Sequence, residues 1–203
     1  MGSLLKFAML LSVLMFSCGK PRYLPENELI EFARNERNGL VRSVQMGDIE
    51  MEVTYRPTDL LVAQELKSYQ QPTNDQISVV REKYKNHYYF VLSLSKGGRE
   101  LLSPANQGVP GFSDLLQTIS FRLGEKVFLT TQSQDTIAAA DYVYNRTFGM
   151  GQSTDILFVF DNAEAVGQEY IHLNFDEFGI GIGKQSFRFF IRDLEGCPKI
   201  FKP

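Results

Sequence analysis

Helical periodicity ends near Gly124, and this change constrains the fold more than any other feature of the sequence. Before it, segments with helical spacing alternate with segments in which apolar and polar residues alternate as in strands. After it, only strand-like segments follow, at 126–131, 136–147, 155–161, 169–175 and 186–193. This order predicts an α+β fold on a mainly antiparallel sheet, with several short helices in the first half and a β-rich second half.

The first half contains the clearest single strand. Apolar residues at 49, 51, 53 and 55 alternate with polar ones, and Met46-Gly47-Asp48 joins this segment to residues 40–45 as a predicted β-hairpin. The segment 87–95 is apolar on both faces, which predicts an interior position in the sheet. Helical patterns begin near residues 26, 58, 77 and 113.

Composition is that of an ordinary folded domain, with 43% hydrophobic and 22% charged residues. The formal charge is -3, and it becomes -4 if residues 1–17, which contain Lys6, are removed. A mildly acidic body offers no general attraction to nucleic acid, so we expect no nucleic-acid partner. About 185 residues would remain, which predicts a single α+β domain over residues 26–203.

The N-terminus has the pattern of a signal peptide. Lys6 is followed by an uncharged run from Phe7 to Phe16, which is too short to span a bilayer. The run leads into Ser17 and Cys18, and Leu14-Met15-Phe16-Ser17-Cys18 resembles the lipobox of bacterial lipoproteins. The match departs at Phe16, where the usual pattern has a smaller residue. An ordinary secretory peptide that is cleaved near a cysteine is the alternative.

The resemblance implies that residues 1–17 are removed and that the Cys18 sulfur carries a diacylglycerol. Two or three acyl chains of the palmitate type hold a protein on a bilayer without spanning it. Residues 18–25 include two prolines and are expected to form a short tether; the seven residues after Cys18 reach only about 23 Å. The resemblance therefore implies a cell-envelope protein, lipid-anchored to the outer membrane on its periplasmic or surface face.

A glycine-rich segment at 178–186 has some features of a nucleotide-binding loop. A P-loop needs glycine five residues before its Gly-Lys pair, but Phe178 stands there, and Gln185 follows Lys184 where Ser or Thr is required. We therefore interpret the segment as a turn or a bulged strand in which Ile180 and Ile182 pack inward. No cofactor is predicted.

The strand around His172 carries the best candidate polar face. Alternation puts Tyr170, His172, Asn174 and Asp176 on one side, where a histidine and a carboxylate could bind a metal or exchange protons. His172 and Asp176 lie about 13 Å apart on an extended chain, so they cannot share one ion. With two histidines and with Cys197 as the remaining cysteine, no metal site is predicted. A solvated sheet face explains the same pattern.

Two further features concern modification and the second cysteine. Asp135-Thr136-Ile137 resembles the sequence at which some Gram-negative bacteria O-glycosylate envelope proteins, so Thr136 is a possible O-glycosylation site. If Cys18 carries lipid, Cys197 has no partner within the chain. Cys197 is then either a buried small hydrophobic residue or a free thiol.

No catalytic residue can be assigned from these patterns. We expect a binding or scaffolding role in an envelope assembly, with the membrane and an envelope protein or glycan as partners. The alternative is a small envelope hydrolase that acts on glycan or peptidoglycan through carboxylates, which would need two of them about 5 to 10 Å apart. Aromatic residues such as those in Phe187-Arg188-Phe189-Phe190 belong either to a covered core or to an exposed binding face.

Overall fold

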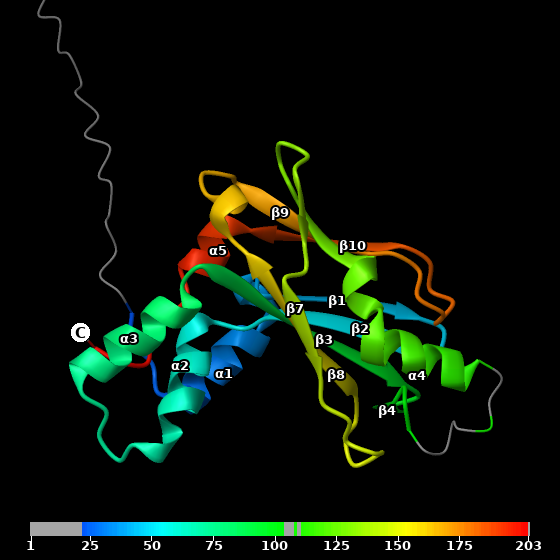
Figure 1. The fold of residues 1–203 in the computed structure, drawn as a ribbon, viewed down its shortest axis with the longest axis horizontal. Coiled ribbons are helices and arrows are strands. Elements are labelled where there is room, and N and C mark those ends of the chain that lie inside the picture. Colours follow the sequence, from blue (N-terminus) through cyan, green and yellow to red (C-terminus); the bar gives the residue numbers. More distant parts are fainter. Residues whose placement is uncertain (1–21, 104–107, 109–110, 203) are drawn as a thin grey trace, which may run out of the picture.

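The computed structural model describes residues 22–103, 108 and 111–202. In this part of the chain, two antiparallel sheets and five α-helices form an α+β fold, which confirms the predicted class. Figure 1 shows α1, α2 and α3 grouped at one end of the sheets and α4 at the other. The helices are α1 (Glu26–Arg34), α2 (Thr58–Glu65), α3 (Asn74–Tyr84), α4 (Phe112–Phe121) and α5 (Ile191–Glu195).

Each sheet has a simple antiparallel order. Sheet 1 runs β1 (Val41–Met46), β2 (Ile49–Tyr55), β3 (His87–Lys96), β8 (Thr154–Asp161) and β7 (Asp141–Tyr144), with β4 (Arg99–Glu100) also paired to β3. Sheet 2 runs β10 (Gln185–Phe190), β9 (Tyr170–Phe175), β5 (Val127–Thr131) and β6 (Thr136–Ala138). The predicted hairpin is therefore β1 and β2, and β3 lies inside its sheet as predicted.

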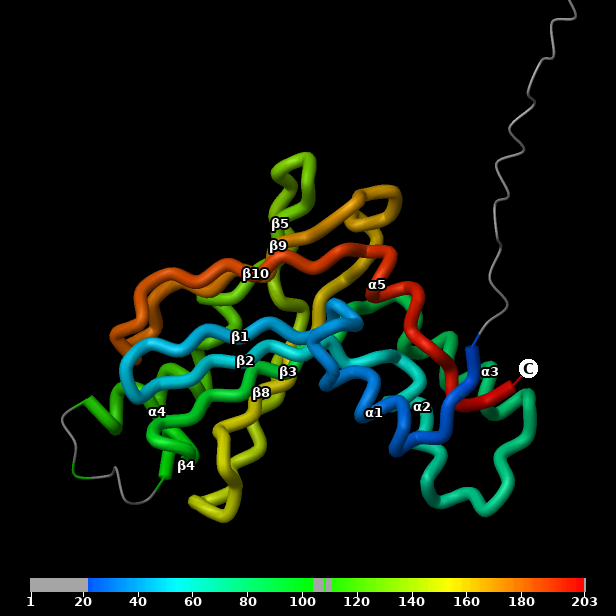
Figure 2. The backbone as a smooth tube through the Cα atoms, turned by 180° about the vertical axis from the view of Figure 1, so that it is seen from behind, coloured from blue at the N-terminus to red at the C-terminus, as the bar shows by residue number. Residues whose placement is uncertain are grey.

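The two sheets pack face to face around the main core. Apolar side chains on alternate positions of each strand point inward, and aromatic rings meet between the sheets: Phe90 lies 5.0 Å from Phe189, and Phe158 lies 6.2 Å from Phe175, centroid to centroid. At one edge β1 and β10 run side by side (Figure 2), where the Arg42 Nε donates a hydrogen bond to the Arg188 carbonyl at 3.0 Å.

The predicted strand 136–147 is wrong as one element. It forms two strands, β6 in sheet 2 and β7 in sheet 1, so the chain changes sheets at residues 139–140. The Ala140 N–H donates to the Val159 carbonyl at 2.8 Å, which starts the pairing with β8. Alternation of apolar residues continues across the change, because both strands have an inward and an outward face.

The last predicted strand is too long at its C-terminal end. β10 stops at Phe190, and residues 191–195 form α5. Ile191 and Leu194 are both buried, at the spacing of one helical turn, so the helix covers the end of the core. In the part of the chain that the structure describes, none of the helices has the length and apolarity needed to cross a bilayer.

Candidate functional site

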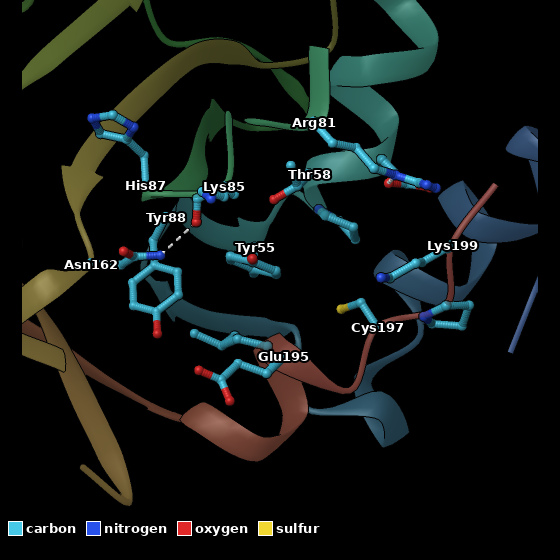
Figure 3. A pocket seen from close by; sticks show the side chains of 14 residues that line it. Tyr55, Thr58, Arg81, Lys85, His87, Tyr88, Asn162, Glu195, Cys197 and Lys199 are labelled. Carbon is cyan, nitrogen blue, oxygen red and sulfur yellow. Dashed lines mark hydrogen bonds and ion pairs between the residues drawn. The ribbon is translucent and has the colours of Figure 1, made fainter. Parts of the chain in front are cut away.

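The candidate site is a cavity of about 290 Å³ at the end of the molecule where α2 begins and the C-terminal segment passes. We call it the C-terminal pocket; it is lined by residues from segments 55–59, 85–88 and 194–199, together with Arg81 and Asn162. Figure 3 shows the side chains that surround it. Segments that are far apart in the sequence meet there, so the pocket exists only in the folded protein.

Two tyrosines form the aromatic part of the pocket. The rings of Tyr55, at the end of β2, and Tyr88, in β3, pack edge to face with centroids 6.1 Å apart. Burial raises the pKa of Tyr55 far above its usual value and raises that of Tyr88 to about 12, with smaller contributions from nearby acidic groups such as Glu195. Both phenols are therefore neutral at physiological pH and can donate hydrogen bonds.

A buried carboxylate holds the C-terminal wall of the pocket in place. The two oxygens of Asp59 accept hydrogen bonds from Nε and Nη2 of Arg81, at 2.9 and 2.6 Å. The same carboxylate accepts the N–H of Ile200 at 2.7 Å, and Arg81 also donates to the carbonyl of Phe201 at 2.7 Å. Asp59 is thus fully used in fixing the chain and is not free for chemistry.

The beginning of the described chain lies against the same wall. The N–H of Lys199 donates to the carbonyl of Arg22 at 2.8 Å, and the N–H of Leu24 donates to the carbonyl of Lys199 at 2.9 Å. These bonds form a parallel bridge between Tyr23 and Lys199. The end of the predicted tether is therefore attached to a residue that lines the pocket.

Cys197 lines the pocket but is not an activated nucleophile. Its Sγ lies 3.4 Å from the carbonyl oxygen of Asp193, to which the thiol donates. Burial raises the pKa of this thiol to about 12, and the Asp193 charge adds to the effect. The residue is half-buried, and the thiol stays protonated at neutral pH.

His87 cannot activate this thiol. It precedes Tyr88 on β3, so the two side chains point to opposite faces of the sheet. In Figure 3 the imidazole points away from Tyr55 and Cys197, and its ring packs 6.2 Å from that of Tyr89. A cysteine–histidine pair is therefore not formed here.

Charged groups at the mouth give the pocket its polarity. Lys85 is paired with Glu82 at 2.5 Å, whereas Lys199 and Glu195 form no ion pair with another described residue. The Lys199 side chain extends toward Cys197 in Figure 3. The pocket thus combines an aromatic surface with one ammonium and one carboxylate that are available to a ligand.

The predicted polar face lies elsewhere, on the outside of sheet 2. Tyr170, His172, Asn174 and Asp176 alternate with buried residues along β9 and its end, as expected, but none of them lines the pocket. Each has its own contact: His172 accepts from Arg188 at 3.2 Å, Asn174 donates to the Thr130 hydroxyl at 3.0 Å, and Asp176 pairs with Lys184 at 2.8 Å. Within the described residues no group of three or more His, Cys, Asp or Glu could hold a metal ion.

The glycine-rich segment binds a carboxylate of its own chain. The Glu177 side chain accepts the N–H groups of Gly179, Ile180 and Gly181 at 2.8 to 3.0 Å, and that of Gly183 as well. Partial burial raises the pKa of Glu177, but the four N–H groups outweigh that effect and lower it. The segment is the β9–β10 turn with both isoleucines buried, in agreement with the prediction.

The two predicted modification sites are Cys18 and Thr136. Cys18, the predicted lipidation site, lies outside the described residues. Thr136 is exposed at the start of β6, where a glycosyl group would reach solvent. Sequence reasoning missed Tyr55, Tyr88 and Lys199 as a group, because no local pattern brings residues of β2, β3 and the C-terminal segment together.

Comparison with known proteins adds little on function. No family model and no curated protein matches this chain. A protein of unknown function from Burkholderia pseudomallei is similar in structure, with 12% identity over 86% of this chain and 93% of that one and a TM-score of 0.37. A DUF4426 family protein from Pseudomonas aeruginosa PAO1 is also similar in structure. The match covers 74% of this chain and 91% of that one, with 11% sequence identity and a TM-score of 0.34.

Proposed function

We propose that this protein is a lipid-anchored component of the bacterial cell envelope, held at the outer membrane, that binds an envelope protein or glycan through the C-terminal pocket. The observation that carries the proposal is the bond between the Lys199 N–H and the Arg22 carbonyl. Three residues lie between Cys18 and Arg22, so four residue steps give a reach of at most about 14 Å. If Cys18 is acylated, the pocket lies close to the membrane surface.

The chemistry of the pocket favours binding over catalysis. The Cys197 thiol and both phenols stay protonated at neutral pH, so none of them is a ready nucleophile. The carboxylates among the lining residues are Asp59 and Glu195, and Asp59 is occupied by Arg81. A carboxylate hydrolase needs two functional carboxyl groups facing one substrate, which makes the hydrolase alternative the weaker proposal.

The anchor is tested by replacing Cys18 with serine in the full-length precursor. We expect the wild-type protein to fractionate with outer membranes and to carry an acylated N-terminal Cys18 in mass spectra. The C18S protein should accumulate as an uncleaved precursor or appear in a soluble fraction, because the thioether cannot form. A wild-type mature N-terminus at another residue, without acyl mass, contradicts the anchor.

The pocket is tested by site-specific photocrosslinking in cells. A photoreactive amino acid at position 85, on the rim, should give a discrete adduct, and the same group at the exposed Arg99 position serves as the control. Lys199→Glu should reduce the adduct from position 85, since it reverses the free charge at the mouth. An adduct of equal yield from both positions, unaffected by Lys199→Glu, argues against the pocket as the binding site.

A further inference from the structure

A continuous row of cations and aromatic rings crosses the outer side of sheet 2. Arg192 lies 5.0 Å from the Phe190 ring, and that ring lies 6.5 Å from the ring of Tyr170. The guanidinium of Arg188 stacks 4.6 Å from the Tyr170 ring, and its Nε donates to Nε2 of His172 at 3.2 Å. We call these five residues the cation–aromatic row.

The arrangement follows from the register of two neighbouring strands. Arg188 faces His172, and Phe190 faces Tyr170, in the antiparallel pairing of β10 with β9. All four lie on the outward side, where residues are half-buried or exposed, while Phe187, Phe189 and Ile171 fill the core. Arg192 follows in the first turn of α5. The register of the two strands therefore sets the order of the row along the sheet surface.

The positive charge of the row is only partly neutralised within the described chain. Arg188 takes part in no ion pair with another described residue, and Arg192 has a weak contact of 3.5 Å with the adjacent Asp193, with 77% of its side chain exposed. Asp176, at the end of the same face, is paired with Lys184. Burial and the charge of Arg188 both lower the pKa of His172, which therefore stays neutral and accepts the Arg188 hydrogen bond.

Two guanidinium groups beside aromatic rings are well suited to bind oxyanions. In Arg188 the Nε–H is used by His172, and the two Nη groups remain to form paired hydrogen bonds to a carboxylate. The rings of Tyr170 and Phe190 between them add an amphipathic surface for a ligand that has an apolar side. A ligand that carries several carboxylates along an extended chain can contact both arginines.

We propose that the cation–aromatic row binds an anionic polysaccharide that carries carboxylate groups. The surface is separate from the C-terminal pocket, but the choice of a polysaccharide over a nucleic acid rests on the proposed envelope location. A local cationic row on a chain of net charge -3 also favours selective binding over general attraction to polyanions. Neutral glycans lack the carboxylates that the two arginines recognise.

The test uses the full mature chain with Cys18→Ser, which removes the lipid and leaves the row unchanged. Affinity electrophoresis or calorimetry at low ionic strength compares polygalacturonate with its methyl ester, which has the same backbone without the charges. We expect binding to polygalacturonate and at least tenfold weaker binding to the ester. The affinity for polygalacturonate should decrease as the salt concentration rises.

Substitutions assign the binding to the row. Arg188→Gln and Arg192→Gln should each weaken polygalacturonate binding about tenfold, the effect expected for one lost charge-assisted contact. Arg188→Lys should recover only part of it, because an ammonium lacks the planar fork. Arg99→Gln changes the net charge equally at an exposed position of β4 and should alter binding less than twofold. Circular dichroism should be the same for all four variants, since the side chains lie on the surface.

Other outcomes overturn the proposal. Equal affinity for the acid and its ester removes the role of carboxylates, and equal losses with Arg188→Gln and Arg99→Gln remove the role of the row. Tighter binding to single-stranded oligothymidylate than to polygalacturonate assigns the face to nucleic acid instead. Because this assay uses unlipidated protein and an unaltered pocket, its result is independent of the anchoring and crosslinking experiments.

Discussion

At the scale of single residues, Asp59 has the largest structural role of any carboxylate near the pocket. Its side chain is 7% exposed and joins α2, α3 and the C-terminal segment through Arg81 and Ile200. We predict that Asp59→Asn destabilises the protein by about 3 kcal/mol, because it leaves the charge of Arg81 without its partner in a partly buried place. Urea unfolding measures the change.

An exposed ion pair provides the control for Asp59. Lys83→Gln removes the 2.7 Å contact with Glu65, in which the Lys83 side chain is 59% exposed, and should change the stability far less than Asp59→Asn, because solvent screens an exposed ion pair. Amide exchange at Ile200 should accelerate in Asp59→Asn and not in Lys83→Gln. Similar losses of stability in both variants would contradict a special role for the buried carboxylate.

Glu177 gives a pH-dependent prediction at the same scale. Its folded-state pKa is lowered, so its contribution to stability is present above the unfolded value of about 4.3 and is lost as the pH falls through the lower folded value. We expect protection of the Gly179 and Gly181 amides to decrease in that acidic range. In Glu177→Gln the protection of these two amides should already be weak at pH 7, since one neutral amide oxygen replaces a charged carboxylate. Hydrogen exchange followed by NMR measures the protection in both proteins.

At the scale of elements, Glu100 fixes the connection between β7 and β8. The residue is 2% exposed, and its carboxylate accepts the N–H groups of Gly149 and Gly151 and the hydroxyl of Thr147. Burial raises the pKa of Glu100, but these three donors together lower it by more, so the pKa lies below its usual value and Glu100 is ionised at neutral pH. One charged side chain on β4 thus organises the turn that leads into β8.

Loss of this carboxylate should release the turn. We predict that Glu100→Ala lowers the free energy of unfolding by about 2 kcal/mol and exposes residues 147–153 to limited proteolysis, because buried donors lose their acceptor. Asp155→Ala, which removes a bond to Ser153 in an exposed position, serves as the control. An unchanged cleavage pattern in Glu100→Ala would contradict the prediction, because it would show that backbone pairing alone holds the turn.

At the scale of the whole molecule, the two halves of the sequence do not form separate sheets. β3, from the first half, lies between β2 and β8, and β7 continues the same sheet. Rings of the two sheets meet in one core, as with Phe90 and Phe189. A strand such as β8 therefore depends on β3 for one of its edges and on sheet 2 for cover.

A fragment of residues 125–203 tests this dependence. We predict that it is unfolded or poorly soluble alone, because β8 would present an unpaired edge and sheet 2 would lose the cover that β1, β2 and β3 provide. Co-expression with residues 19–124 should restore soluble protein, because the first half supplies β1, β2 and β3. Sharp, dispersed amide resonances from the isolated fragment would show that the second half folds independently.

Patterns within a few residues of one another were enough for much of the local structure. Alternation along residues 49–55 and 170–175 identified strands and their inward faces, because side chains of a strand point alternately to its two sides. The residues of segment 178–186 were also enough, by themselves, to exclude a P-loop. The outward face around His172 followed from the same rule, although Arg188, its main partner, comes from another strand.

Long-range contacts decided the rest. The change of sheet at residues 139–140 depends on which strand Ala140 meets, and the C-terminal pocket depends on a hydrogen bond between residues 141 positions apart, Asp59 and Ile200. Alternation constrains which side of a strand is apolar but not which strand lies beside it. The class of the fold and the expected lipid anchor at Cys18 therefore come from the sequence alone, whereas the pocket and the cation–aromatic row exist because packing brings distant segments into contact.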